Sequence, residues 1–122
     1  MTINFIPFWY NKEAEVNVTW NSKKMNKIFS DERKLIVKFG ATIAKKVQLR
    51  IWEMQQVDDL RQLSLYPPAG LHELKGQYAG LFAVALTGNW RLIVQGFDEQ
   101  GTSTTQLETI VNVVIVEVID YH

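Results

Sequence analysis

Residues 71–94 read LHELKGQYAGLFAVALTGNWRLIV, and this stretch decides the predicted fold. Two apolar runs, 81–86 and 90–94, flank the turn-forming residues Thr-Gly-Asn, which is typical of a β-hairpin. Residues 71–80 are more polar and indicate a loop that leads into the hairpin. This loop contains His72, one of two histidines in the chain. We therefore expect a hairpin with an ionisable loop at its entrance.

Strand and helix patterns lie on either side of this hairpin. Val16, Val18 and Trp20 alternate with polar residues, which predicts a half-buried strand. In residues 109–119 both alternating sets are rich in valine and isoleucine, so this strand is expected in the middle of a sheet. Between these strands, one apolar stripe with helical spacing comprises Ile36, Phe39, Ile43, Val47, Ile51 and Met54.

Local signals predict where the helices begin and end. Asn21 or Ser22 is a candidate N-cap for a first helix, and Ser30 is a candidate for the next one. Gly40 interrupts the apolar stripe, and glycine is unfavourable inside a helix. We therefore expect one helix to end at Gly40 and another to begin directly after it.

The order of elements predicts an α+β fold, in which an N-terminal strand and a helical hairpin pack on a mostly antiparallel sheet. Residues 66–70 (YPPAG) predict a break, so that His72 lies in an irregular loop. Residues 1–122 form one expected domain, and residues 1–15 form an N-terminal extension. This extension is expected to pack as an edge strand or to pair with a partner. Its apolar side chains are Ile3, Phe5, Ile6, Phe8, Trp9 and Tyr10.

Composition limits the chemistry that the chain can perform. The absence of cysteine excludes disulfides and thiolate metal sites. The sequence has neither a signal-peptide pattern nor an apolar run long enough to cross a bilayer, which predicts a soluble cytoplasmic protein without a membrane partner. Its two histidines and scattered carboxylates lack the spacing of metal ligands, so we expect neither a metal nor another cofactor.

Charge is unevenly distributed, although the formal net charge is zero. Residues 16–50 contain nine basic side chains and only two acidic ones. Helical spacing predicts that several of the basic residues face away from the apolar stripe, namely Lys34, Lys38, Lys45 and Arg50. The pattern is typical of a basic face that binds a polyanion, and equally of a solvated helical surface.

The histidines suggest one specific chemistry. Cleavage of RNA without a metal needs a base for the 2′-hydroxyl, an acid for the leaving oxygen and a cation for the phosphorane. His72 and His122 are candidates for base and acid, and Lys75 and Arg91 for the cations. If the last strand continues to the end of the chain, its alternation puts Asp120 and His122 on one face and Tyr121 on the other.

Structural roles explain the same residues without catalysis. A lone histidine is more often structural or exposed than catalytic, and Arg91 is as well explained by an ion pair with Asp120 or Glu117. Phe82 and Trp90 are expected in the core rather than as stacking platforms for bases.

Three motifs in order resemble the HigB group of the RelE/ParE toxin superfamily. They are His72-x-Leu74-Lys75-Gly76, Arg91-Leu92-Ile93 and the terminal sequence EVIDYH of residues 117–122. The resemblance extends from about residue 16 to the C-terminus. It implies a RelE-like toxin fold and a toxin of a type II toxin-antitoxin pair that acts as a ribosome-dependent mRNA endonuclease. It also implies a HigA-type helix-turn-helix antitoxin as partner, beside the ribosome and mRNA, with operator DNA contacted only through the antitoxin.

Carried over by position, the resemblance implies a set of site residues. The catalytic set is His72, Asp120, Tyr121 and His122, with Lys75 and Arg91 as phosphate contacts. Candidate contacts to RNA or the ribosome are Lys23, Lys24, Lys38, Lys45 and Lys46. Three departures from the family stand out. Ala85 replaces a usually charged residue, residues 96–109 are longer than the usual turn, and residues 1–15 are an added N-terminal piece in a chain of zero net charge.

A non-catalytic protein on the same scaffold is the alternative prediction. It would be a ParE-like gyrase inhibitor or an inactive HigB homologue that only assembles with its antitoxin. The paired histidines favour the enzyme, because an inhibitor that acts by binding needs no acid and base.

Overall fold

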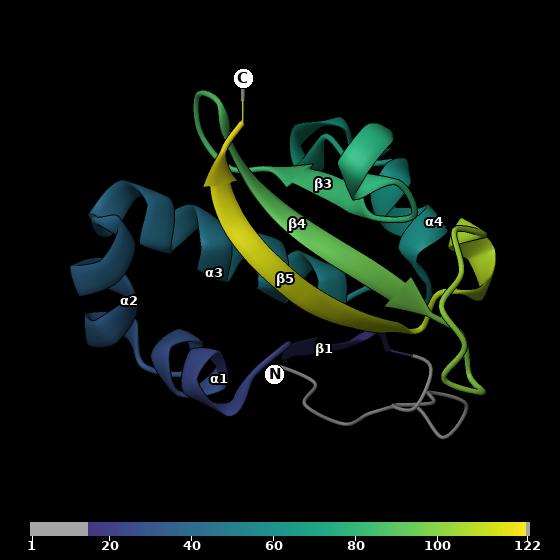
Figure 1. Ribbon diagram of the computed structural model, residues 1–122, viewed down its shortest axis with the longest axis horizontal. Coiled ribbons are helices and arrows are strands. Elements are labelled where there is room, and N and C mark those ends of the chain that lie inside the picture. Colours follow the sequence, from purple (N-terminus) through teal and green to yellow (C-terminus); the bar gives the residue numbers. More distant parts are fainter. Residues whose placement is uncertain (1–14, 122) are drawn as a thin grey trace, which may run out of the picture.

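The structure, a computed structural model, describes residues 15–121 and has an α+β fold (Figure 1). Of the predicted N-terminal extension, residues 1–14 lie outside the described range, as does His122. The strands are β1 (Asn17–Trp20), β2 (His72–Glu73), β3 (Phe82–Ala85), β4 (Trp90–Phe97) and β5 (Asn112–Asp120). The helices are α1 (Lys23–Phe29), α2 (Glu32–Phe39), α3 (Ala41–Gln55) and α4 (Leu60–Ser64), with short 3-10 turns η2 (Pro67–Ala69), η3 (Gly76–Tyr78) and η4 (Leu107–Thr109).

The five strands form one mixed sheet in the order β1-β5-β4-β3-β2. β1 runs parallel to β5, and the other three pairs are antiparallel. The predicted hairpin is confirmed as β3 and β4, which begin and end on either side of the turn at residues 86–89. The position of β5 between β1 and β4 confirms the prediction that the valine-rich strand lies inside the sheet.

Helix ends follow the expected signals in two of three places. Ser22 caps α1, because its side chain accepts a hydrogen bond from the Met25 amide. Gly40 separates α2 from α3 with φ 85°, a value that glycine adopts without strain. The predicted cap at Ser30 is wrong, since the Asp31 carboxylate accepts the amides of the first turn of α2.

The helices pack on one face of the sheet, and α3 lies behind β4 and β5 in Figure 1. Their buried side chains form a single core with apolar residues of β1, β3, β4 and β5. Leu35 is fully buried in this core, whereas Ile36 is 37% exposed, so the predicted stripe is displaced by one residue in α2. Over residues 15–121, no helix is long and apolar enough to cross a membrane.

Arg50 in α3 points into the core, and the prediction that it faces solvent is wrong. Its side chain is 4% exposed. Nε donates to the Ala85 carbonyl at 2.7 Å, Nη2 donates to the Pro68 carbonyl at 2.7 Å, and Nη1 pairs with Glu53 at 2.9 Å. A guanidinium tolerates burial when its donors are satisfied in this way. Arg50 therefore links α3 to β3 and to the turn η2.

His72 lies in a strand and not in an irregular loop. β2 pairs with β3 through His72 opposite Ala83 and Glu73 opposite Phe82. The break at residues 66–70 is confirmed, because η2 contains both prolines and ends at Gly70 with φ 57°. β2 has only two residues, so its pairing with β3 rather than its own sequence defines it.

Candidate functional site

The second face of the sheet, opposite the helices, carries four of the predicted site residues, namely His72, Lys75, Arg91 and Tyr121. Register places His72, Ala83, Ile93 and Glu117 in one row across four strands, and paired residues share a face. A second, smaller core covers the centre of this face, where Leu74 packs on Ala83 and Ile93. The segment 74–81 therefore lies over β3 and β4. His72 at one end of the row is exposed, and Glu117 at the other end is half-buried.

Tyr78, Glu117 and Tyr121 form a polar cluster at the β5 end of this face. The Tyr78 hydroxyl donates a 2.8 Å hydrogen bond to Oε1 of Glu117. This bond raises the pKa of Tyr78 above its ordinary value of 10.0, and desolvation and the nearby Glu117 and Tyr121 add to the effect. Tyr78 therefore keeps its proton at neutral pH and is a hydrogen-bond donor in this cluster.

The end of β5 is fixed to the β3–β4 turn. The Tyr121 amide donates to the Asn89 carbonyl at 2.7 Å. Trp90 is paired with Asp120 and packs against the helix core, so Asp120 lies on the helix side and Tyr121 follows on the other side. His122, the remaining member of the predicted catalytic set, lies outside the described residues.

Arg91 also lies at this turn. Its Nη1 donates to the carbonyls of Gly88 at 2.8 Å and of Trp90 at 2.9 Å. These bonds hold the guanidinium beside the turn to which Tyr121 is attached. Within residues 15–121, Nε and Nη2 of Arg91 make no hydrogen bond, so they are additional donors for an anion.

His72 lies apart from the β5 end. Three strand spacings separate its Cα from that of Glu117, which is roughly 14 Å, and Tyr121 lies roughly 13 Å further along β5. The side chains of His72 and Tyr121 cannot span this separation. The exposed His72 ring has Nδ1 at 3.2 Å from the Gly70 carbonyl. With the proton on Nδ1, this contact is a hydrogen bond that leaves Nε2 as the basic nitrogen.

The predicted lysines lie in two other places. Lys75 is exposed and directly precedes η3, near the His72 end of the sheet. The helix lysines belong to elements on the first face, so the sheet separates them from the polar cluster. Of these, Lys23, Lys24, Lys38 and Lys45 are exposed and Lys46 is half-buried.

Two members of the polar cluster were not predicted as site residues. Glu117 is a charged residue inside a strand of valines and isoleucines, which is an unusual position for a carboxylate. This unusual position was the one signal in the sequence that could have identified Glu117 as a site residue. Tyr78 had no comparable signal, because its contact with Glu117 spans 39 residues of sequence.

Comparisons with protein-family models, curated proteins and solved structures found no match. The HigB-type assignment therefore remains a prediction from the motifs. Within the described range 15–121, no group of three or more His, Cys, Asp or Glu side chains is placed to hold a metal ion. The arrangement offers hydrogen-bond donors and a carboxylate at the end of β5, and a separate histidine at the edge of the sheet.

Proposed function

We propose that this protein is a HigB-type toxin with a RelE-like fold, which cleaves mRNA on the ribosome by metal-independent acid–base chemistry. A HigA-type helix-turn-helix antitoxin is the proposed partner that silences it. The observation that carries the proposal is the polar cluster of Tyr78, Glu117 and Tyr121 at the end of β5. Asp120 and Tyr121, the described part of the Asp-Tyr-His motif on which the resemblance depends most, lie at the C-terminal end of β5, and Tyr121 belongs to this cluster.

In the proposed reaction, the scissile phosphodiester lies at the end of β5. A base removes the 2′-hydroxyl proton, the oxygen attacks phosphorus, and an acid gives a proton to the departing 5′ oxygen. His122 is the proposed proton-transfer group, and Arg91 stabilises the charge on the phosphorane. The protonated Tyr78 hydroxyl orders the Glu117 carboxylate beside Tyr121, which is proposed to stack on a base.

His72 is proposed to act at a neighbouring position of the same RNA strand. Its distance from Tyr121 exceeds the reach of both side chains, so direct proton exchange between them is excluded in this arrangement. An extended RNA strand on the second face would pass His72 and Lys75 before it reaches the end of β5. Both residues would then hold the substrate rather than react with it.

Growth after induced expression tests this proposal. His122→Ala is expected to abolish growth arrest, because it removes the proposed proton-transfer group. Circular dichroism of the purified variant checks that the fold is intact. Additional residues fused after His122 are expected to impair arrest as well, through crowding. Unchanged arrest in His122→Ala would remove the terminal histidine from the mechanism.

The separation of His72 from the β5 end favours one second candidate, a non-catalytic toxin or interaction protein on this scaffold. Such a protein needs no acid and base at a common phosphate. The two candidates differ in their products, because only the enzyme generates new RNA ends.

A further inference from the structure

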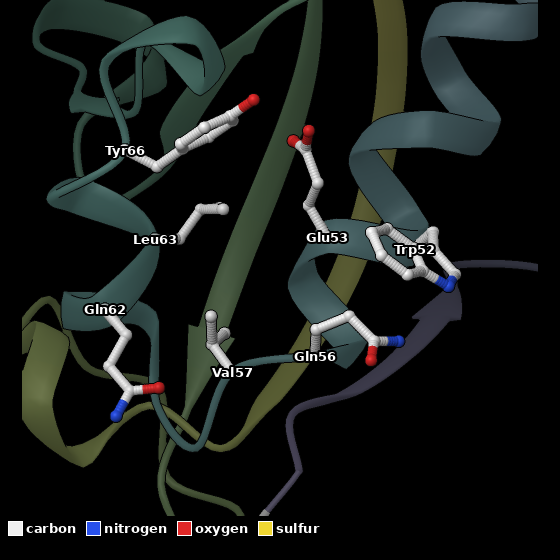
Figure 2. Close-up of a pocket in the computed structure, with 7 residues that line it drawn as sticks. All are labelled: Trp52, Glu53, Gln56, Val57, Gln62, Leu63 and Tyr66. Carbon is white, nitrogen blue, oxygen red and sulfur yellow. The ribbon is translucent and has the colours of Figure 1, made fainter. Parts of the chain in front are cut away.

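An apolar groove lies between the C-terminal end of α3 and α4, far from the polar cluster in sequence and on the helix side of the sheet (Figure 2). It has a volume of about 470 Å³. Trp52 and Tyr66 stand at opposite sides of the groove in Figure 2, and both are substantially exposed, by 58% and 46%. Among residues 15–121, the groove is lined by Trp52, Glu53, Gln56, Val57, Gln62, Leu63 and Tyr66.

Two of the polar side chains that line the groove, Glu53 and Gln62, are already engaged within the fold. Both carboxylate oxygens of Glu53 accept hydrogen bonds from Arg50. The side-chain oxygen of Gln62 accepts the Asp58 amide at 2.8 Å. Recognition of a polar small molecule needs convergent polar groups that are available to it. The groove therefore suits an apolar peptide segment better than a polar ligand.

The N-terminal end of the described chain lies directly beside this groove. The Val16 amide donates a 3.0 Å hydrogen bond to the carbonyl of Val57, which is one of the lining residues. Fifteen residues precede Val16 in the sequence. An extended chain covers about 3.3–3.6 Å per residue, so Tyr10, six positions before Val16, can reach any point within roughly 20 Å of it.

The sequence of this preceding segment matches the groove in polarity. Residues 3–10 read INFIPFWY and include no charged side chain. Burial of a large apolar side chain contributes about 1.5–3 kcal/mol, and exposed Trp52 and Tyr66 offer aromatic partners for it. Because this segment is tethered to the same chain, its effective concentration at the groove is higher than that of a free partner.

We propose that residues 3–10 of the same chain dock in the groove between α3 and α4. Trp52 and Tyr66 then clamp an apolar side chain of this segment, and the hydrogen bond between Val16 and Val57 anchors the point from which the segment departs. The inference does not depend on the proposed endonuclease activity.

Paramagnetic relaxation tests the proposal in the full-length chain. Because the sequence has no cysteine, Thr2→Cys gives a single site for a nitroxide label. We expect strong broadening of backbone amides in residues 52–57 and 62–66, and none in residues 98–103 on the β4–β5 connection. Absence of broadening at the groove would overturn the proposal. Broadening that appears equally when labelled chains are mixed with unlabelled, isotope-enriched chains would also overturn it, because the occupant would then be a second copy.

Matched substitutions show whether the groove itself holds the segment. Trp52→Ala and Tyr66→Ala are expected to remove most of the broadening, by weakening docking roughly tenfold or more. Leu49→Ala and Leu65→Ala are the controls, since both residues are exposed, lie close in sequence to the clamp residues and do not line the groove. Equal effects of clamp and control variants would contradict docking in this groove.

Discussion

Arg50 connects the helical layer to the segment that carries His72. Its guanidinium contacts Pro68, in the turn before β2, and Ala85, at the end of β3. Ala85 also lies close to Gly70, where an added Cβ would come within 3.1 Å of the Ala85 side chain. A single buried side chain therefore defines the entry of the chain into β2.

Arg50→Ala is expected to lower the free energy of unfolding by about 3 kcal/mol or more, because two carbonyls and the Glu53 carboxylate lose their buried partner. Urea unfolding followed by circular dichroism measures the change. Lys45→Ala on the exposed side of α3 is the control and should stay within about 0.5 kcal/mol of wild type. Equal stability of the two variants would show that the buried arginine is dispensable.

Tyr78 makes a contribution to stability that depends on pH. Its folded-state pKa lies above the ordinary value of 10.0, so the neutral phenol is favoured by folding. The contribution is full below pH 10 and is lost as the pH rises through the folded-state pKa. The stability difference between wild type and Tyr78→Phe should therefore be largest at neutral pH and shrink above pH 10. A difference that grows above pH 10, in urea unfolding at each pH, would contradict the hydrogen bond to Glu117.

At the scale of elements, strand β4 approaches the segment before β5 at a position where only glycine fits. A Cβ on Gly96 would come within 2.8 Å of Cγ1 of Ile110, which is fully buried. Gly96 does not have a positive φ, so steric contact rather than backbone strain selects glycine here.

Gly96→Ala is expected to lower the free energy of unfolding by about 1–3 kcal/mol through overpacking. Ile110→Ala removes the opposing side chain, so Gly96→Ala should cost much less in that background. The double-mutant cycle, measured by urea unfolding, yields this coupling. Additive effects of the two substitutions would mean that Gly96 and Ile110 do not compete for the same space.

The sequence predicted those elements whose signals are local. The β3–β4 hairpin, the helix break at Gly40 and the interior position of β5 each follow from turn chemistry or from periodicity. Two-residue β2 has no periodicity of its own and depends on pairing with β3. Helical spacing predicted that Arg50 faces away from the apolar stripe, but Arg50 follows Val47 by three residues and lies on the buried face of α3. Its burial depends on the Glu53 carboxylate and on the carbonyls of Pro68 and Ala85, and these two carbonyls are distant in sequence.

The candidate site was predicted only in part, because motifs are local in sequence whereas the distances between them are not. Motifs identified His72, Arg91 and the C-terminal end of β5. Arg91 and the end of β5 both form hydrogen bonds with the β3–β4 turn. The distance between His72 and Tyr121 depends on the order of four strands, which no local pattern contains. Their roles in catalysis stay predictions.

At the scale of the whole molecule, the sheet separates the helix lysines from the polar cluster. The helices carry exposed lysines on one side, and the polar cluster lies on the other. The lysines therefore cannot contact the phosphate that is proposed to be cleaved. We propose that they contact a second region of RNA, which a ribosome would provide.

Substitution of Lys23, Lys24 and Lys38 by alanine is expected to weaken co-sedimentation with ribosomes. The slope of log affinity against log salt should fall by roughly 0.7 for each phosphate that the variant no longer neutralises. Arg61→Ala, an exposed cation on α4 outside this lysine group, is the control. An unchanged slope in the triple variant, or an equal change in Arg61→Ala, would indicate that the lysines are only a solvated surface.

The most direct test of the proposed activity is to map transcript 5′ ends in cells after induced expression, for the wild type and for a His72→Ala/His122→Ala double variant. We predict new ends, in phase with the reading frames of translated messages, that appear with the wild type and are absent with the double variant. Growth arrest of equal strength in both, without new ends, would contradict the nuclease and favour an inhibitor that acts by binding.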